Sequence, residues 1–105
     1  MSAIAEHLTD AEVLRVLGER LKAKRLGRNI TIDFLSERTG MNRKTIMDVE
    51  SGKDSRLSSV VRYLRGMSML STLEAAFPDE LPSGDGLSSR GQPRLKASSI
   101  RRRRG

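Results

Sequence analysis

The sequence contains no cysteine and only one histidine, His7, among its 105 residues. Without cysteine, disulfides and thiolate metal sites are excluded, and one histidine leaves no histidine-rich metal site and little scope for general-base catalysis. Aromatic residues make up only 3% of the chain. This scarcity favours helices over a β-sandwich, whose strands are rich in aromatic and β-branched residues. We therefore expect a small all-α protein without a metal or another cofactor.

Long apolar runs are also missing. No stretch approaches the roughly 20 apolar residues that a membrane-spanning helix needs, and no signal-peptide core is present. We therefore expect a cytoplasmic protein. No nucleophile lies near a base in the sequence, and no glycine-rich phosphate loop follows a strand, so we expect no enzymatic activity.

The charge balance is basic, with a net charge of +7. Residues 1–77 carry 13 basic and 10 acidic residues, a net of +3, whereas residues 78–105 carry 7 and 3, a net of +4. A basic balance suits a polyanionic partner such as nucleic acid, although ribosomal proteins and membrane-surface peptides share it. The second segment is rich in Ser, Gly, Pro and Arg and lacks periodicity, which predicts a disordered basic tail.

Capping signals and spaced apolar residues predict five helices. Thr9 with Glu12 forms a capping box, and Ser71 with Glu74 forms another. The expected helices run from Thr9 to Gly27, from Thr31 to Gly40, from Asn42 to Gly52, from Leu57 to Met67 and from Ser71 to Phe77. We expect their buried sides to include Leu17, Phe34, Leu35, Ile46, Val49 and Leu57. Gly18 marks either a break in the first helix or a close contact.

The junction between the second and third helices is the most informative feature. Leu35 lies where an apolar side chain must face the core, Ser36 where only a small side chain lets the next helix approach, and Gly40 where a positive φ is expected. Ile46 and Val49 share the buried face of the third helix. The outward side chains near its beginning are then Arg43, Lys44, Met47 and Asp48.

The run TIDFLSERTGMNRKTIMDVESGK, at residues 31–53, resembles the helix-turn-helix of the Cro/Xre repressor family. The resemblance covers roughly residues 16 to 77. It implies a five-helix, lambda-repressor-like DNA-binding domain over residues 9–77, followed by the flexible basic tail at 78–105. The run SSVVRYLRGMSMLSTLEAAFPDE with a basic tail also resembles the HipB-type antitoxin branch, in which such a repressor pairs with a HipA-type kinase toxin.

The resemblance also implies roles for individual residues. Arg43, Lys44 and Asp48 match base-reading positions, and Met47 lies on the same face, where a thymine methyl is within reach. The positions that match phosphate contacts are Asn42, Thr45, Lys53, Ser55 and Arg56. The family usually has a glutamine at the start of the second helix that bonds the DNA backbone, and Ile32 cannot do this. Asp48 is equally suited to pair with Lys44, four residues earlier.

Two further expectations concern packing. Dimerisation is expected through the fourth and fifth helices, with Leu70, Leu73 and Phe77 at the interface, because a dimer engages two half-sites of an operator. The family resemblance implies that Arg25 and Glu50 form an ion pair inside the domain. The physical argument agrees, because a carboxylate near a helix C-terminus is disfavoured by the dipole unless a cation compensates it.

The sequence therefore predicts a homodimeric transcriptional repressor that binds a palindromic operator in double-stranded DNA and, when bound, associates with the nucleoid. Two alternatives remain: a protein-interaction antitoxin that neutralises a toxin, and a controller protein of a phage or restriction system. RNA binding is disfavoured because aromatic platforms for stacking bases are absent. The tail is either a soluble disordered segment, an arm along the DNA, or a segment that orders on a protein partner.

Overall fold

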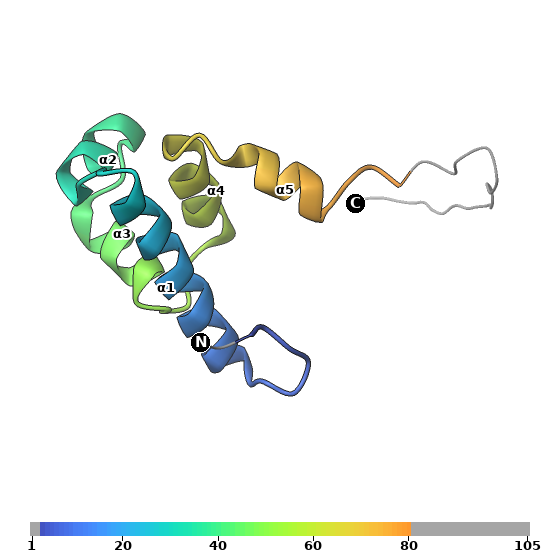
Figure 1. The fold of residues 1–105 in the computed structure, drawn as a ribbon. Coiled ribbons are helices and arrows are strands. Elements are labelled where there is room, and N and C mark those ends of the chain that lie inside the picture. Colours follow the sequence, from blue (N-terminus) through green and yellow to red (C-terminus); the bar gives the residue numbers. More distant parts are fainter. Residues whose placement is uncertain (1–2, 81–105) are drawn as a thin grey trace, which may run out of the picture. The chain divides into compact units, whose positions relative to one another are not determined.

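The computed structural model describes residues 3–80, which contain five helices and no strand, so the all-α class is confirmed for this part of the chain. The helices are α1 (Asp10–Gly27), α2 (Ile32–Thr39), α3 (Arg43–Glu50), α4 (Leu57–Gly66) and α5 (Leu70–Ala76). Figure 1 follows them along the chain. The chain divides after Thr72 into two units, which are described separately. Between residues 3 and 80 no helix combines the length and the apolar character that a membrane crossing requires. The expected tail lies outside the described residues from position 81 onward.

Side-chain caps begin the first three helices, as predicted. At α1, Thr9 Oγ1 accepts from the Glu12 amide at 3.1 Å, and Glu12 Oε1 accepts from the Thr9 amide at 2.8 Å. Thr31 Oγ1 accepts from the amide of Phe34 at 3.0 Å to cap α2. Each bond occupies an amide that the first helical turn leaves without a partner, and each spans three residues. These helix starts are therefore local properties of the sequence.

Some predicted helix ends differ from the structure. Helix α1 includes Gly27, and the chain turns at Arg28 and at Asn29, which has φ 58°. Asparagine tolerates this left-handed conformation better than most residues, so a glycine is not needed there. Helix α5 begins at Leu70, one residue before the predicted cap Ser71. The amide of Thr72 bonds the carbonyl of Met69 at 3.0 Å, which places the helix start before Ser71.

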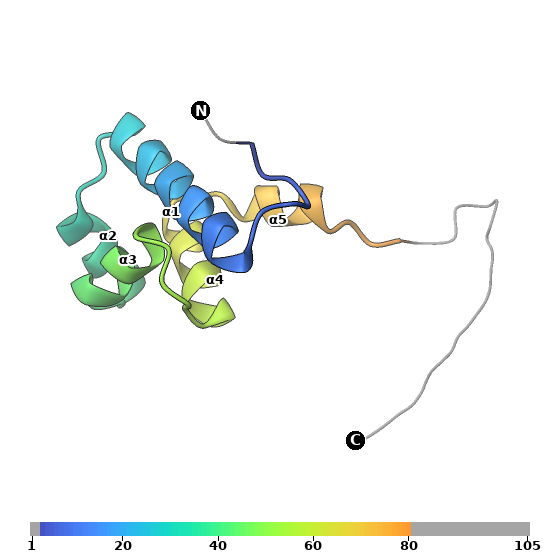
Figure 2. The same cartoon turned by 90° about the horizontal axis from the view of Figure 1, so that it is seen from below.

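The core of the unit before the break at Thr72 gathers around α3. Helix α3 packs against α1, α2 and α4, and α2 also packs against α4; Figure 2 shows these helices from a second direction. The buried apolar side chains are Val16, Leu21, Leu35, Met41, Ile46, Val49, Tyr63, Leu64, Met67 and Met69. With only one aromatic side chain among them, the core is built mainly from flexible and aliphatic groups.

Three side chains predicted to be buried are exposed instead. Phe34 is 48% exposed because its neighbour Leu35 takes the core position of α2, about 100° away around the helix. Leu17 is 37% exposed because Val16 faces the core in its place, and Leu57, the first residue of α4, is 78% exposed. The prediction was therefore wrong at these three positions, where a short apolar run does not show which of its members points inward.

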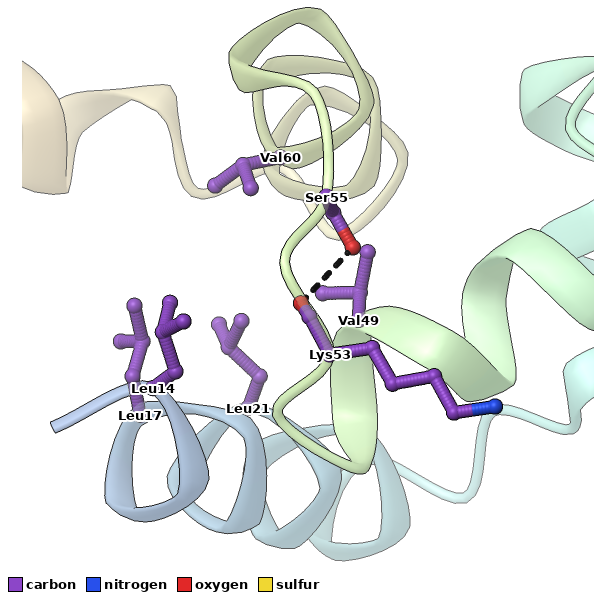
Figure 3. A pocket seen from close by; sticks show the side chains of 7 residues that line it. All are labelled: Leu14, Leu17, Leu21, Val49, Lys53, Ser55 and Val60. Carbon is purple, nitrogen blue, oxygen red and sulfur yellow. Dashed lines mark hydrogen bonds between the residues drawn. The ribbon is translucent and has the colours of Figure 1, made fainter. Parts of the chain in front are cut away.

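An apolar groove lies between α1 and α4 in the described chain. Figure 3 shows Leu14, Leu17 and Leu21 of α1 on one side of this groove and Val60 of α4 on the other, with Val49 from the end of α3 between them. The groove thus leaves aliphatic surface of both helices open.

Gly18 lies where α1 crosses the end of α3. A Cβ atom at this position would lie 2.5 Å from the carbonyl O of Glu50 and 2.7 Å from that of Val49. Helix α1 continues unbroken through Gly18. Of the two alternatives for this glycine, the structure therefore shows the close contact and not the break.

We expect Gly18→Ala to lower the free energy of unfolding by about 1–3 kcal/mol, because α1 and α3 must separate to accept the methyl group. This loss outweighs the higher helix propensity of alanine, which is worth about 1 kcal/mol. Gly27→Ala is the matched control, because a Cβ there meets nothing within 4 Å. It should leave stability unchanged or raise it by up to about 1 kcal/mol. Urea denaturation measures both, and equal stabilisation by the two variants would contradict the contact.

Candidate nucleic-acid interface

A three-residue turn fixes the direction of α3 relative to α2. Gly40 has φ 79°, and its amide donates to the carbonyl O of Ser36 at 2.9 Å. The hydroxyl of Ser36 donates in turn to the carbonyl O of Met41 at 2.6 Å, and the Met41 side chain is buried. Sequence reasoning identified Ser36 by its small size but missed the bond made by its hydroxyl. Asn42 then caps α3 by accepting from the amide of Thr45 at 2.9 Å.

Helix α3 has one buried and one exposed side. Ile46 and Val49 are 0% and 6% exposed, and they fix the helix against the core. The four predicted base-reading positions lie together on the opposite side, because the pairs Arg43/Met47, Lys44/Met47 and Lys44/Asp48 are three or four residues apart and are therefore neighbours on the helix surface. Of these, Arg43, Lys44 and Met47 are exposed and Asp48 is half-buried.

Arg43 pairs with Asp33, which lies in the first turn of α2. Arg43 Nε lies 3.1 Å from Asp33 Oδ1, and the two side chains are 67% and 74% exposed. An exposed pair of this kind contributes under about 1 kcal/mol to stability. The pair engages Nε, whereas an end-on bidentate contact to guanine uses the two terminal nitrogens of the guanidinium group. The contact with Asp33 is therefore compatible with base reading by Arg43.

Asp48 lies between two lysines. Its carboxylate is 3.1 Å from Lys44 Nζ and 3.4 Å from Lys53 Nζ. The hydrogen bond from Lys44 is the main cause that holds the pKa of Asp48 below its usual value, against the opposing effect of desolvation and with a smaller contribution from the hydrogen bond of Lys53. The predicted alternative, in which Asp48 pairs with Lys44, is thus present in the structure. A cytosine that donates to this carboxylate would share it with the two lysines, because each oxygen accepts more than one hydrogen bond.

The five positions matched to phosphate contacts fall into three groups. Asn42 Oδ1 accepts both from the amide and from the hydroxyl of Thr45 at 2.9 Å, so this oxygen is occupied by the cap. Lys53 and Arg56 are exposed, and Arg56 stands at the N-cap of α4. Ser55 is half-buried, and its hydroxyl donates to the carbonyl O of Lys53 at 3.1 Å beside the apolar groove (Figure 3). Asn42 and Arg56 thus stand at two helix N-termini, where partial positive charge favours anions.

The predicted pair between Arg25 and Glu50 is present and buried. Arg25 Nε donates to Glu50 Oε2 at 2.6 Å, and Arg25 Nη2 donates to Glu50 Oε1 at 3.1 Å. The other terminal nitrogen, Nη1, donates to the carbonyl O of Ile30 at 2.8 Å. The hydrogen bond to Glu50 raises the pKa of Arg25, against the opposing effect of burial. The guanidinium group therefore connects α1, the loop before α2 and the end of α3.

Tyr63 of α4 completes this cluster, and sequence reasoning did not find it. The phenol is 0% exposed, and its hydroxyl donates to Glu50 Oε2 at 2.5 Å and also lies 3.2 Å from the carbonyl O of Leu21. Burial first, and then the hydrogen bond to Glu50, raise the pKa of Tyr63 well above its usual value. A single buried tyrosine in an otherwise aliphatic stripe was the available signal, because a buried hydroxyl requires a partner.

Of the predicted dimer residues, Leu70 and Leu73 lie on α5 and Phe77 directly follows it, and none of the seven residues of this helix is buried. Leu70 is half-buried and belongs to the unit that ends at Thr72. In the second unit, Leu73 is half-buried and Phe77 is 78% exposed. The three side chains therefore leave apolar surface without a cover.

We expect Glu50→Gln to lower the free energy of unfolding by about 3–5 kcal/mol, because the change leaves the buried Arg25 cation without its counter-charge. Asp33→Asn is the control, since it breaks the exposed pair with Arg43 and should cost under about 1 kcal/mol. Chemical denaturation of the full chain measures both changes. Similar losses for the two variants would show that the Arg25–Glu50 pair is not the buried contact described here.

The raised pKa of Tyr63 gives a second prediction for the same cluster. The chain contains one tyrosine and no tryptophan, so ultraviolet absorbance reports this phenol alone. The folded protein should show no phenolate at pH 10, whereas in the chain unfolded in urea the phenol should titrate with a pKa of about 10. Because the folded pKa is the higher one, stability is unaffected below the unfolded pKa and falls as the pH rises above it. A phenolate that forms near pH 10 without unfolding would contradict the buried hydrogen bond.

No protein-family model and no curated protein matches this chain. A function is therefore inferred from the residues and contacts described above.

Proposed function

We propose that this chain is a transcriptional repressor without enzymatic activity, which binds a palindromic DNA operator in the cytoplasm as a homodimer. The observation that carries the proposal is the exposed side of α3 with Arg43, Lys44 and Met47, directly after the three-residue turn from α2. In a helix-turn-helix protein this part of the second helix enters the major groove.

Polar and basic side chains follow the start of α3 and the loop after it. Asn42 at the start of α3 and Arg56 at the start of α4 offer positions for phosphates, with Lys53 on the loop between these helices. Phosphate contacts set register and orientation, whereas base contacts select the sequence. The ion pairs of Arg43 and Lys44 with carboxylates of the same chain are exposed. Because such pairs contribute little, DNA can replace them at small cost.

The buried cluster supports this role mechanically. Glu50, at the last position of α3, is bonded to Arg25 of α1 and Tyr63 of α4. The helix that presents the reading residues is therefore held on two sides, while its outward side chains stay accessible. A fixed helix suits recognition of base edges, since the supporting elements set the position of each contact.

A second candidate is an autoregulatory antitoxin that also binds a HipA-type kinase toxin. The resemblance at residues 58–80 suggests it, and the uncovered apolar surface of the groove and of α5 favours a protein partner. Affinity purification from the native host distinguishes this role, because a kinase should co-purify with the antitoxin and not with a simple repressor.

The proposed DNA contacts differ in their effect on specificity. Arg43→Ala should weaken binding to the selected operator by about 1–3 kcal/mol and relax the preference at one base pair. Arg56→Ala should weaken binding to all duplexes alike and reduce the slope of log affinity against log salt by about one. Arg62→Ala is the control. This exposed arginine lines a hollow with Arg38 and Arg65, and that hollow contains none of the predicted DNA-contacting residues. Fluorescence anisotropy with operator and scrambled duplexes measures all three, and sequence-blind losses for Arg43→Ala would refute its role.

To test dimerisation through α5, a charged residue is introduced into the apolar surface at its end. Phe77→Glu should shift the protein toward monomer at micromolar concentration without unfolding it, because the side chain is exposed in the single chain. Glu74→Gln, on α5 three residues earlier, is the control, since it alters charge and leaves the apolar side chains in place. Light scattering measures the mass. A wild-type monomer that binds DNA one-to-one would contradict the homodimer.

A further inference from the structure

An open hollow on the outer side of α3 has two apolar side chains in its wall. Ile32, the first residue of α2, and Met47 line it together, and the buried Arg25 and Glu50 form its floor. Lys22 of α1 also lines the hollow and is exposed. Ile32 had no role in the predicted DNA contacts, but the structure places it beside a predicted base-reading residue.

The surroundings of the hollow are basic. Arg43 and Lys44 stand one turn before Met47 on the same helix, and all three side chains are exposed. Met47 is 50% exposed and Ile32 is half-buried. Apolar groups do not bind phosphate, so the cations attract a polyanion to this surface while the hollow itself suits an apolar group on it. The C5-methyl group of thymine is the apolar group that base edges present in the major groove.

We propose that Ile32 and Met47 together form a reader of one thymine methyl group in each half-site of the operator. The proposal rests on the proposed DNA-binding function and makes Ile32 a specificity-determining residue. Met47 closes over the methyl with its flexible thioether chain, and Ile32 supplies the fixed side of the contact from the start of α2. The methyl group leaves water on binding, which is the source of the preference.

The spacing along α3 limits where this thymine lies. Met47 follows Arg43 by four residues, which corresponds to about 6 Å along the helix. Successive base pairs are about 3.4 Å apart. The thymine read by the hollow should therefore lie within about two base pairs of the guanine read by Arg43.

The test starts from an operator selected with the full-length protein from a random duplex library. Each thymine of one half-site is then replaced singly by deoxyuridine, which removes only the methyl group. Replacement at one position, within about two base pairs of the guanine assigned by Arg43→Ala, should weaken wild-type binding about fourfold. Met47→Ala and Ile32→Ala should bind the two duplexes with equal affinity. Leu26→Ala, which removes an exposed side chain outside the hollow, should keep the fourfold difference.

The outcomes distinguish a failure of the proposed thymine-methyl contact from a failure of the proposed DNA-binding function on which it rests. If an operator is selected but no thymine responds to deoxyuridine, the methyl reader is wrong and DNA binding stands. The same holds if Met47→Ala retains the full fourfold difference. If the library yields no enriched sequence, the repressor function itself is overturned, and the reader with it. Thermal melting checks that each variant folds, and Met47→Ala decides the outcome if Ile32→Ala is unstable.

Discussion

The buried carboxylate of Glu50 is the interaction on which the rest of the domain depends. It accepts two hydrogen bonds from Arg25 and one from Tyr63, so three helices meet at one charged group. A carboxylate removed from water is costly unless such partners replace its hydration. The pair is therefore stronger evidence for a fixed geometry than for net stability, because an apolar substitute of similar shape could stabilise the domain as well.

The close approach at Gly18 and the cluster at Glu50 act on the same end of α3. Gly18 lets the backbone of α1 come against the last residues of α3, and Arg25, two turns further along α1, bonds the side chain of Glu50. The opposite, outward side of α3 carries the exposed ion pairs of Arg43 and Lys44. The helix is thus fixed through its buried contacts, while its surface contacts are weak enough to be exchanged for a ligand.

Apolar surface beyond this core remains open. Leu17 in the groove between α1 and α4 is 37% exposed, and Phe77, directly after α5, is 78% exposed. Small domains bury a limited share of their surface, so uncovered apolar side chains are expected on a chain of this size. In the described chain they are spread over the elements, with Leu17 and Leu26 on α1, Phe34 on α2, Met47 on α3, Leu57 on α4 and Phe77 after α5.

The sequence by itself determined the features that depend on neighbouring residues. The caps at Thr9, Thr31 and Asn42 and the left-handed turn at Gly40 are local, because each involves residues within four positions along the chain. The exposed side of α3 followed from its spacing, and the family resemblance, together with the dipole argument, indicated the pair of Arg25 with Glu50.

Only the tertiary structure decided the contacts between distant residues. The hydroxyl of Tyr63 donates to Glu50, thirteen positions away, and Ile32 lines the same hollow as Met47. The structure also decided that Leu35 and not Phe34 fills the core of α2. Periodicity restricts a side chain to a sector of its helix, whereas the packing of other helices against that sector determines whether the side chain is buried and which group it contacts.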